Sequence, residues 1–156
     1  LTYLLQTQKD MRFKARKGHK YGAKKVHKHG KKFDSILELY FYEKLIALGI
    51  TFEFQRKEVL QGAFRHNGKA VREIAMYIDF VVHDRNKTYF LDTKGFFTDI
   101  SKLKYKMLTH KYFLDSTGRD FEITFIRNKK EADSIGLWLK KELSDDKKKD
   151  MVKQGY

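Results

Sequence analysis

The sequence predicts an α/β protein, and three observations lead to this prediction. Apolar residues recur with a helical period in three segments, residues 35–48, 99–114 and 128–143. They follow strand patterns in four others, residues 51–60, 74–83, 88–94 and 121–126. Two turn signals, Asn67-Gly68 and Arg85-Asn86, join three of these strands. We therefore expect a helix, an antiparallel three-stranded meander, a second helix, a further strand and a third helix, in that order.

The charge is concentrated near the start of the chain. The 156 residues carry a net charge of +14, and 41% of them are hydrophobic, which is enough for one domain with a core. Residues 9–32 hold eleven lysines and arginines against the single acid Asp10, a net charge of +10. We expect a flexible basic arm over 1–32, a folded domain over 33–143 and a charged tail over 144–156. A basic arm favours a polyanion as partner.

Composition also excludes several classes of site. The chain has no cysteine, so it can form neither a disulfide nor a thiolate zinc site. No apolar run approaches the roughly 20 residues that a membrane span needs, and the opening Leu1-Thr2-Tyr3-Leu4-Leu5 is too short for a signal peptide. We expect a soluble, cytoplasmic protein without a membrane partner.

Ser35 begins the first predicted helix, and Gly49 is placed to end it. Just before it, His29-Gly30 is expected to close a small hairpin between Val26 and Phe33. Glu38 follows Ser35 by three residues, which is the spacing of a capping box. Two interpretations of Glu38 stay open: it caps this helix, or it reaches a pair of aspartates and acts as a third acidic ligand.

The pairing within the meander decides which residue faces Asp79. A two-residue turn at Asn67-Gly68 with regular pairing sets Arg56 across from Asp79. A bulge at Gly62-Ala63 would shift the pairing by one residue and bring Gln55 there instead.

The hairpin over residues 77–95 organises the site. Ile74, Met76, Ile78, Phe80 and Val82 recur with period two, which predicts one apolar face with Asp79 pointing away from it. With a turn at Arg85-Asn86, Asp79 lies directly across from Asp92. Facing carboxylates, roughly 4.5–5.5 Å apart at Cβ, repel each other unless a cation lies between them.

Oxygen ligands of this kind suit Mg²⁺. Lys94 shares a face with Asp92, and we expect it to orient or deprotonate an attacking water or to balance charge on a phosphate. The alternative is that Lys94 is an ordinary ion-pair partner of Asp92.

The last three elements are expected to complete the core. The second helix, from about Asp99 to Leu114, carries the apolar stripe Ile100, Leu103, Met107 and Leu114. The lysines outside this stripe face either solvent or a phosphate backbone. Residues 121–126 form a strand, and Asn128 with Glu131 caps the third helix. Trp138 on that helix is expected in the core or in a dimer contact.

The order of Glu38, then Ile78-Asp79, then Asp92-Thr93-Lys94 resembles the PD-(D/E)XK nuclease core. Residues 20–25 and 33–38, together with the hairpin, resemble small phage-encoded nucleases of that superfamily, grouped with Holliday junction resolvases. Ile78 stands where this family has proline.

The resemblance implies a fold in which helices flank a mixed sheet, and the function of a metal-dependent DNA endonuclease. Glu38, Asp79 and Asp92 would hold Mg²⁺, for which Mn²⁺ would substitute, and Lys94 would be the catalytic lysine, with Gln55 beside them. The implied partner is branched DNA, cut by a homodimer in the host cytoplasm if the protein is phage-encoded. The expected DNA contacts are Arg12, Lys14, Arg16, Lys17, Lys20, Lys24, Lys25, Lys102 and Lys106.

Two other functions are compatible with these residues. The first is a transposition- or packaging-type endonuclease that needs a partner protein. The second is a DNA-binding module without catalysis, in which the acidic residues are structural.

Overall fold

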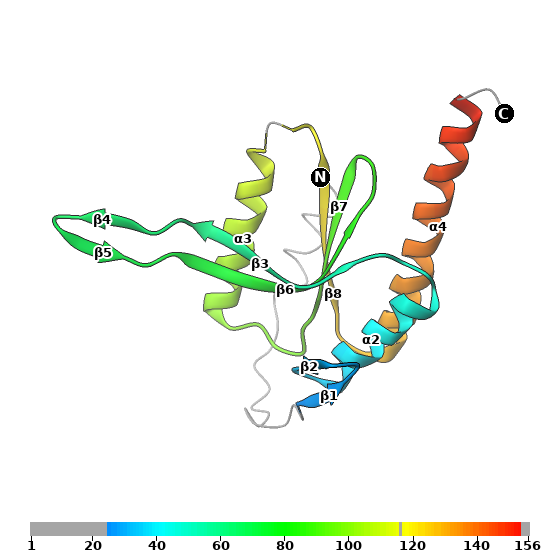
Figure 1. The fold of residues 1–156 in the computed structure, drawn as a ribbon, viewed down its shortest axis with the longest axis horizontal. Helices are drawn as coiled ribbons and strands as arrows, with labels where there is room; N and C mark the ends of the chain where they lie inside the picture. Colours follow the sequence, from blue (N-terminus) through cyan, green and yellow to red (C-terminus); the bar gives the residue numbers. More distant parts are fainter. Residues whose placement is uncertain (1–24, 116, 154–156) are drawn as a thin grey trace.

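A four-stranded mixed sheet forms the centre of the protein (Figure 1). The computed structural model describes residues 25–115 and 117–153, with side chains as far as residue 145. The sheet has the order β3 (Glu53–Gln61), β6 (Ile74–His83), β7 (Lys87–Thr93) and β8 (Asp120–Ile126). Neighbouring strands are antiparallel from β3 to β7, whereas β8 runs parallel to β7. The predicted mixed sheet with flanking helices is therefore confirmed.

Helices cover both faces of the sheet. One core cluster joins α2 (Ile36–Ala47) and α4 (Lys129–Lys153) to one face through Phe41, Phe80 and Leu139. A second cluster joins α3 (Asp99–Phe113) to the other face through Phe90 and Leu108. The apolar groups of the sheet are thus removed from water on both sides.

Local signals set the ends of α2. The Ser35 hydroxyl accepts a hydrogen bond from the Glu38 N–H at 3.0 Å, and Gly49 follows the helix at φ +67°. These are the N-cap and the C′ glycine that the sequence predicts. The small hairpin of β1 (Val26–Lys28) and β2 (Lys31–Phe33) turns at His29-Gly30, and Phe33 is buried under α2. The end of the basic arm therefore belongs to the folded body.

The prediction of a single apolar face for β6 is wrong. Phe80 and Val82 pack beneath α2 and α4, but Met76 and Ile78 pack against α3. The alternation of sides therefore changes at Asp79. On the neighbouring strand it changes at Gln55, whose φ of +51° lies outside the range of a β-strand. Because of these two adjacent irregularities, the residues on either side of them pack into different core clusters.

The prediction for α3 has the right bounds but the wrong face. Ile100, Leu103 and Leu114 are 69%, 58% and 63% exposed, whereas Tyr105 and Leu108 are buried. The physical reason is that two tyrosine rings of α3 pack against aromatic residues of β8, Tyr105 against Phe125 and Tyr112 against Phe121. Tyr105 packs on the edge of Phe125 at 4.8 Å between ring centres.

Helix α4 begins as predicted and is longer than predicted. Asn128 Oδ1 accepts from the Glu131 N–H at 2.9 Å, as an N-cap side chain does, and Glu131 accepts from the N–H of Arg127, one residue before the cap. Trp138 packs edge-on against Tyr89 in the core. The helix continues to Lys153, through residues expected to form a tail, and its last turns extend away from the body (Figure 1).

Within the described residues, no helix has the length and apolar character required to cross a membrane.

Candidate active site

Asp79 and Asp92 meet where the β6–β7 ladder ends. The ladder pairs Val81 with Phe90 and Phe80 with Leu91, so the next position sets Asp79 opposite Asp92, as predicted. At this position the hydrogen bonds between the two strands are accepted by the aspartate side chains instead of backbone carbonyls. Asp92 Oδ1 accepts a hydrogen bond from the Asp79 N–H at 3.3 Å, and Asp79 Oδ2 accepts from the Thr93 N–H at 2.8 Å. The two carboxylates are therefore held by the strands themselves.

The electrostatics of this pair are unfavourable for two negative charges. Burial, together with the neighbouring Asp92 carboxylate, raises the pKa of Asp79 to about 8, although hydrogen bonds from Thr93 oppose this shift. Asp92 is 1% exposed. Asp79 consequently carries a proton at neutral pH unless a cation compensates the two carboxylates.

A residue that the sequence analysis missed, Tyr105, contacts the same pair. Its hydroxyl reaches across from α3 and donates a hydrogen bond to Asp92 Oδ2. Burial and the Asp92 charge raise the pKa of Tyr105 well above its usual value, so the phenol keeps its proton and remains a donor. The sequence does place Tyr105 on the same helical face as Leu108 and Tyr112. This face was not predicted to pack on the sheet, because the apolar stripe of α3 was expected on a different face.

Lys94 lies on the open side of Asp92. Its Nζ is 3.4 Å from Asp92 Oδ2, and its side chain is about one third exposed. The backbone N–H of Lys94 donates to the Ile126 carbonyl on β8, which fixes the chain just after β7 ends. Asp92 Oδ2 therefore lies between a buried hydroxyl and a partly exposed ammonium group.

Gln55 lies across from Asp79 on the other neighbouring strand. The ladder pairs Phe54 with Phe80 and Arg56 with Ile78, which leaves Gln55 facing Asp79. The one-residue shift that produces this register occurs between Val59 and Gln61, slightly before the predicted bulge at Gly62-Ala63. Of the two registers that the sequence left open, the structure has the one that sets Gln55, and not Arg56, across from Asp79.

Glu38 forms a separate group with Gln55. Its carboxylate is 1% exposed and accepts hydrogen bonds from Gln55 Nε2 at 3.1 Å and from the Asp34 N–H. Burial raises the pKa of Glu38, and the hydrogen bonds from Gln55 and Asp34 partly offset that effect. Glu38 thus joins the start of α2 to β3, and the Ser35 cap shows that its backbone takes part in capping.

The structure does not unite the three predicted acidic ligands. Within residues 25–115 and 117–153, no group of three or more histidine, aspartate or glutamate side chains is arranged to hold a metal ion. Of the three predicted ligands, Asp79 and Asp92 are the two whose carboxylates lie side by side. Mg²⁺ commonly binds through one or two carboxylates while water and substrate phosphates fill its other positions. The donor set present therefore fits Mg²⁺ with two protein carboxylates.

Most of the predicted DNA contacts lie outside the described residues, namely Arg12, Lys14, Arg16, Lys17, Lys20 and Lys24. Lys25 is exposed beside β1. Lys102 pairs with Asp99 at 3.2 Å, as expected for a solvated surface lysine. Lys106 is exposed and lines a pocket of about 520 Å³ together with His110 and Leu60.

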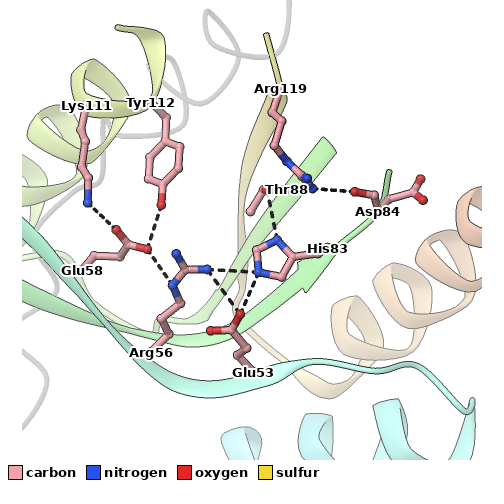
Figure 2. Close-up of polar contacts among 9 residues, drawn as sticks. All are labelled: Glu53, Arg56, Glu58, His83, Asp84, Thr88, Lys111, Tyr112 and Arg119. Atoms are coloured by element: carbon pink, nitrogen blue, oxygen red, sulfur yellow. Dashed lines mark hydrogen bonds and ion pairs between the residues drawn. The ribbon is translucent and has the colours of Figure 1, made fainter. Parts of the chain in front are cut away.

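A second polar cluster, centred on Glu58, fixes α3 to β3 (Figure 2). Glu58 is 2% exposed, accepts hydrogen bonds from Lys111 Nζ at 2.8 Å and the Tyr112 hydroxyl at 2.9 Å, and forms an ion pair with Arg56 Nε at 3.0 Å. The buried negative charge of Glu58 is therefore compensated by Arg56 on β3 and by Lys111 on α3.

Comparison with known proteins gives one match. A family model described as "Protein of unknown function (DUF1064)" matches residues 18–130, which include α2, the whole sheet and α3. No curated protein and no solved structure matches the chain.

Proposed function

The chain belongs to the DUF1064 family, and we propose that this member is a divalent-metal-dependent DNA endonuclease that hydrolyses phosphodiester bonds at Asp79, Asp92 and Lys94. One observation carries the proposal. Two carboxylates meet at a strand end, with an ammonium group 3.4 Å from one of them. The element order of α2, an antiparallel meander, α3 and a parallel strand β8 is also the order that the PD-(D/E)XK resemblance implies.

The raised pKa of Asp79 supports a role for a cation. A second negative charge beside the buried Asp92 is unfavourable without a further cation, and the two carboxylates leave oxygen lone pairs that hydrogen bonds do not use. When bound there, Mg²⁺ would neutralise charge on the phosphate and lower the pKa of a coordinated water.

Each residue of the site then has a distinct task. Asp79 and Asp92 hold the cation, and the Thr93 backbone fixes Asp79. Tyr105 holds Asp92 from the protein interior. Lys94, on the solvent side, faces the space where a phosphate enters, and there it orients the attacking water or balances charge on the phosphate. Gln55, across from Asp79, connects the site to Glu38.

The basic charge supports a nucleic acid as substrate. The net charge of +14 favours a polyanion, and phosphate contacts position DNA without reading its sequence. Branched DNA and a homodimer are the finer parts of the proposal and rest on the resemblance, because a dimer would bring two sites to two strands.

One cleavage assay tests the proposal. Purified protein is incubated with labelled four-way junction and with labelled linear duplex, in Mg²⁺, in Mn²⁺ and in EDTA. We expect metal-dependent cleavage by the wild type and none by Asp79→Asn or Asp92→Asn. Asp115→Asn is the matched control, since it neutralises an exposed aspartate beyond the end of α3. Cleavage by either site variant would refute the assignment of the site.

A non-catalytic DNA-binding module is the second candidate. The observation that favours it is that Glu38 does not join Asp79 and Asp92 in a three-carboxylate group among the described residues. Binding of the junction without cleavage in either metal would support this module. A partner-dependent endonuclease would instead cleave only when a further protein was added.

A further inference from the structure

We propose that the hairpin of β4 (Phe64–His66) and β5 (Lys69–Val71) is a second DNA-contacting element, which grips phosphates about one helical turn of duplex away from the carboxylate pair. The inference rests on the proposed function, because it takes duplex DNA as the substrate of that site. It adds a contact surface outside both the basic arm and α3.

The hairpin stands apart from the rest of the protein (Figure 1). Residues 62–70 are all exposed, so neither side of the ribbon is covered by a helix or by another strand. An isolated two-stranded hairpin has marginal stability in water, since it has no core. Its turn is nevertheless well specified, with Asn67 at φ +47° and Gly68 at φ +75°. A ribbon of this kind is suited to contact a partner on both of its sides.

The charge of the hairpin indicates the chemistry of that partner. Arg65, Lys69 and Arg72 lie on it, and the nearest acidic residue in sequence, Glu73, is already bonded to Lys57. Among the described residues, Lys69 and Arg72 form no ion pair, and Arg65 contacts only the Gly68 carbonyl at 3.4 Å. Phe64 is the one large exposed apolar side chain of the hairpin, so an apolar protein interface is not formed there. Cations without acidic partners favour a polyanion.

The direction of the hairpin relates it to the site. Strands β3 and β6 lead directly into β4 and β5, and these same two strands carry Gln55 and Asp79. Asp79 and Lys69 are ten residues apart, which corresponds to at most about 33 Å at roughly 3.3 Å per residue. One turn of B-DNA spans about 34 Å. A single duplex can therefore reach both the carboxylate pair and the tip of the hairpin.

Further features fit a duplex on this path. The major groove, about 12 Å wide, admits a two-stranded β-ribbon. Between the site and the hairpin, the pocket beside Leu60 is lined by Lys106, His110 and Lys111. Lys111 is already bonded to Glu58, so the exposed Lys106 is the side chain that would continue the basic path from α3 to the hairpin.

The test measures DNA binding in EDTA, so that no cleavage interferes. Fluorescence anisotropy with a duplex of about 30 bp is recorded over a range of salt concentrations. If Arg65, Lys69 and Arg72 each contact a phosphate, their joint replacement by alanine should lower the slope of log K against log salt by about 0.9 × 3, or roughly 2.7. The double variant Lys69→Ala/Arg72→Ala, which removes no contact described above, should lower it by about 1.8.

The matched control removes the same charge elsewhere. Lys130, Lys140 and Lys141 are exposed on α4, which packs on the face of the sheet opposite α3. Their joint replacement by alanine should leave the slope as in the wild type. A duplex of about 8 bp, roughly 27 Å long, is shorter than the extended span of about 33 Å, so its binding at the site should depend less on the hairpin than binding of the longer duplex does. Circular dichroism checks that all variants are folded.

The outcomes separate this inference from the proposed function. An unchanged slope in the hairpin variants, an equal loss in the α4 control, or no DNA binding by the wild type would overturn the inference. Hairpin-dependent binding without metal-dependent cleavage would uphold it and count against the endonuclease. Metal-dependent cleavage, together with a salt slope that does not change in the hairpin variants, would support the endonuclease and overturn the inference about the hairpin.

Discussion

Asp79 is joined to Thr93 by two hydrogen bonds that replace the last rung of the β6–β7 ladder. Its Oδ2 accepts from both the Thr93 N–H at 2.8 Å and the Thr93 hydroxyl at 2.6 Å. The Asp79 carboxylate thus accepts the Thr93 N–H, as a backbone carbonyl would in a continued ladder, at the point where the strands separate. The arrangement holds Asp79 beside Asp92, and its energetic consequence can be measured in the metal-free protein.

The first prediction concerns the pH dependence of stability in EDTA. The pKa of Asp79 rises from 3.8 to about 8 on folding, so between these values the folded state binds more protons than the unfolded state. Wild-type stability should therefore fall as pH rises from about 4 to about 8. Asp79→Asn keeps an acceptor for Thr93 and carries no charge, so its melting temperature should exceed that of the wild type increasingly towards pH 8.

Differential scanning fluorimetry from about pH 5 to pH 8.5 checks this prediction. Mg²⁺ added near pH 8 should raise the melting temperature of the wild type more than that of the variant, because the variant lacks one of the two carboxylates. Parallel pH profiles for the two proteins would show that the carboxylates do not interact as described.

The second prediction concerns Tyr105 as a positioning residue. Tyr105→Phe keeps the buried ring and removes the donor to Asp92. Partners of metal ligands typically change metal affinity or activity by about 10- to 100-fold when mutated. We expect the Mg²⁺ concentration for half-maximal cleavage to rise by about this factor. Tyr112→Phe is the matched control on the same helix, since it loses its bond to Glu58. An equal metal requirement in both variants would give Tyr105 a structural role only.

The third prediction separates the two interpretations of Glu38. Because its carboxylate bonds to Gln55 and to the Asp34 N–H, Glu38→Gln should lower the free energy of unfolding, by about 0.5–2 kcal/mol as for other cap residues. The metal requirement for cleavage should stay close to that of the wild type. Urea unfolding and a Mg²⁺ titration measure the two effects. Loss of cleavage as complete as in Asp92→Asn, with stability unchanged, would instead make Glu38 a ligand.

The fourth prediction concerns the task of Lys94. Lys94→Ala should reduce single-turnover cleavage by about 100-fold or more, the usual range for a positioned proton-transfer group, while metal still binds. Lys94→Arg retains the positive charge but holds its proton to far higher pH. Substantial activity in the arginine variant would mean that Lys94 balances charge. A loss equal to that of alanine would favour proton transfer or strict positioning, and full activity in the alanine variant would remove Lys94 from the mechanism.

The predictions from sequence that the structure confirmed rest on short-range chemistry. Ser35 and Asn128 cap their helices because their side chains accept from an N–H three residues later. Asn67-Gly68 turns the chain because both residues tolerate positive φ. The register that sets Asp79 opposite Asp92 follows from the length of one turn, so two of the proposed site residues were placed together before any long-range contact was known.

Tertiary packing decided which side chains meet. The irregular backbone at Gln55 and the change of side at Asp79 divide β6 between two cores, although its sequence alternates regularly. Tyr105 packs inward against the aromatic residues of the sheet, whereas Ile100 and Leu103 are exposed to solvent. The hydrophobic pattern of α3 by itself does not predict which of its faces is buried. Tyr105 reaches Asp92, and Glu38 reaches Gln55 rather than the aspartates, because separate elements pack at particular distances. Capping, turns and register depend on neighbours in the chain, whereas these contacts depend on surfaces that exist only once the sheet and helices have packed.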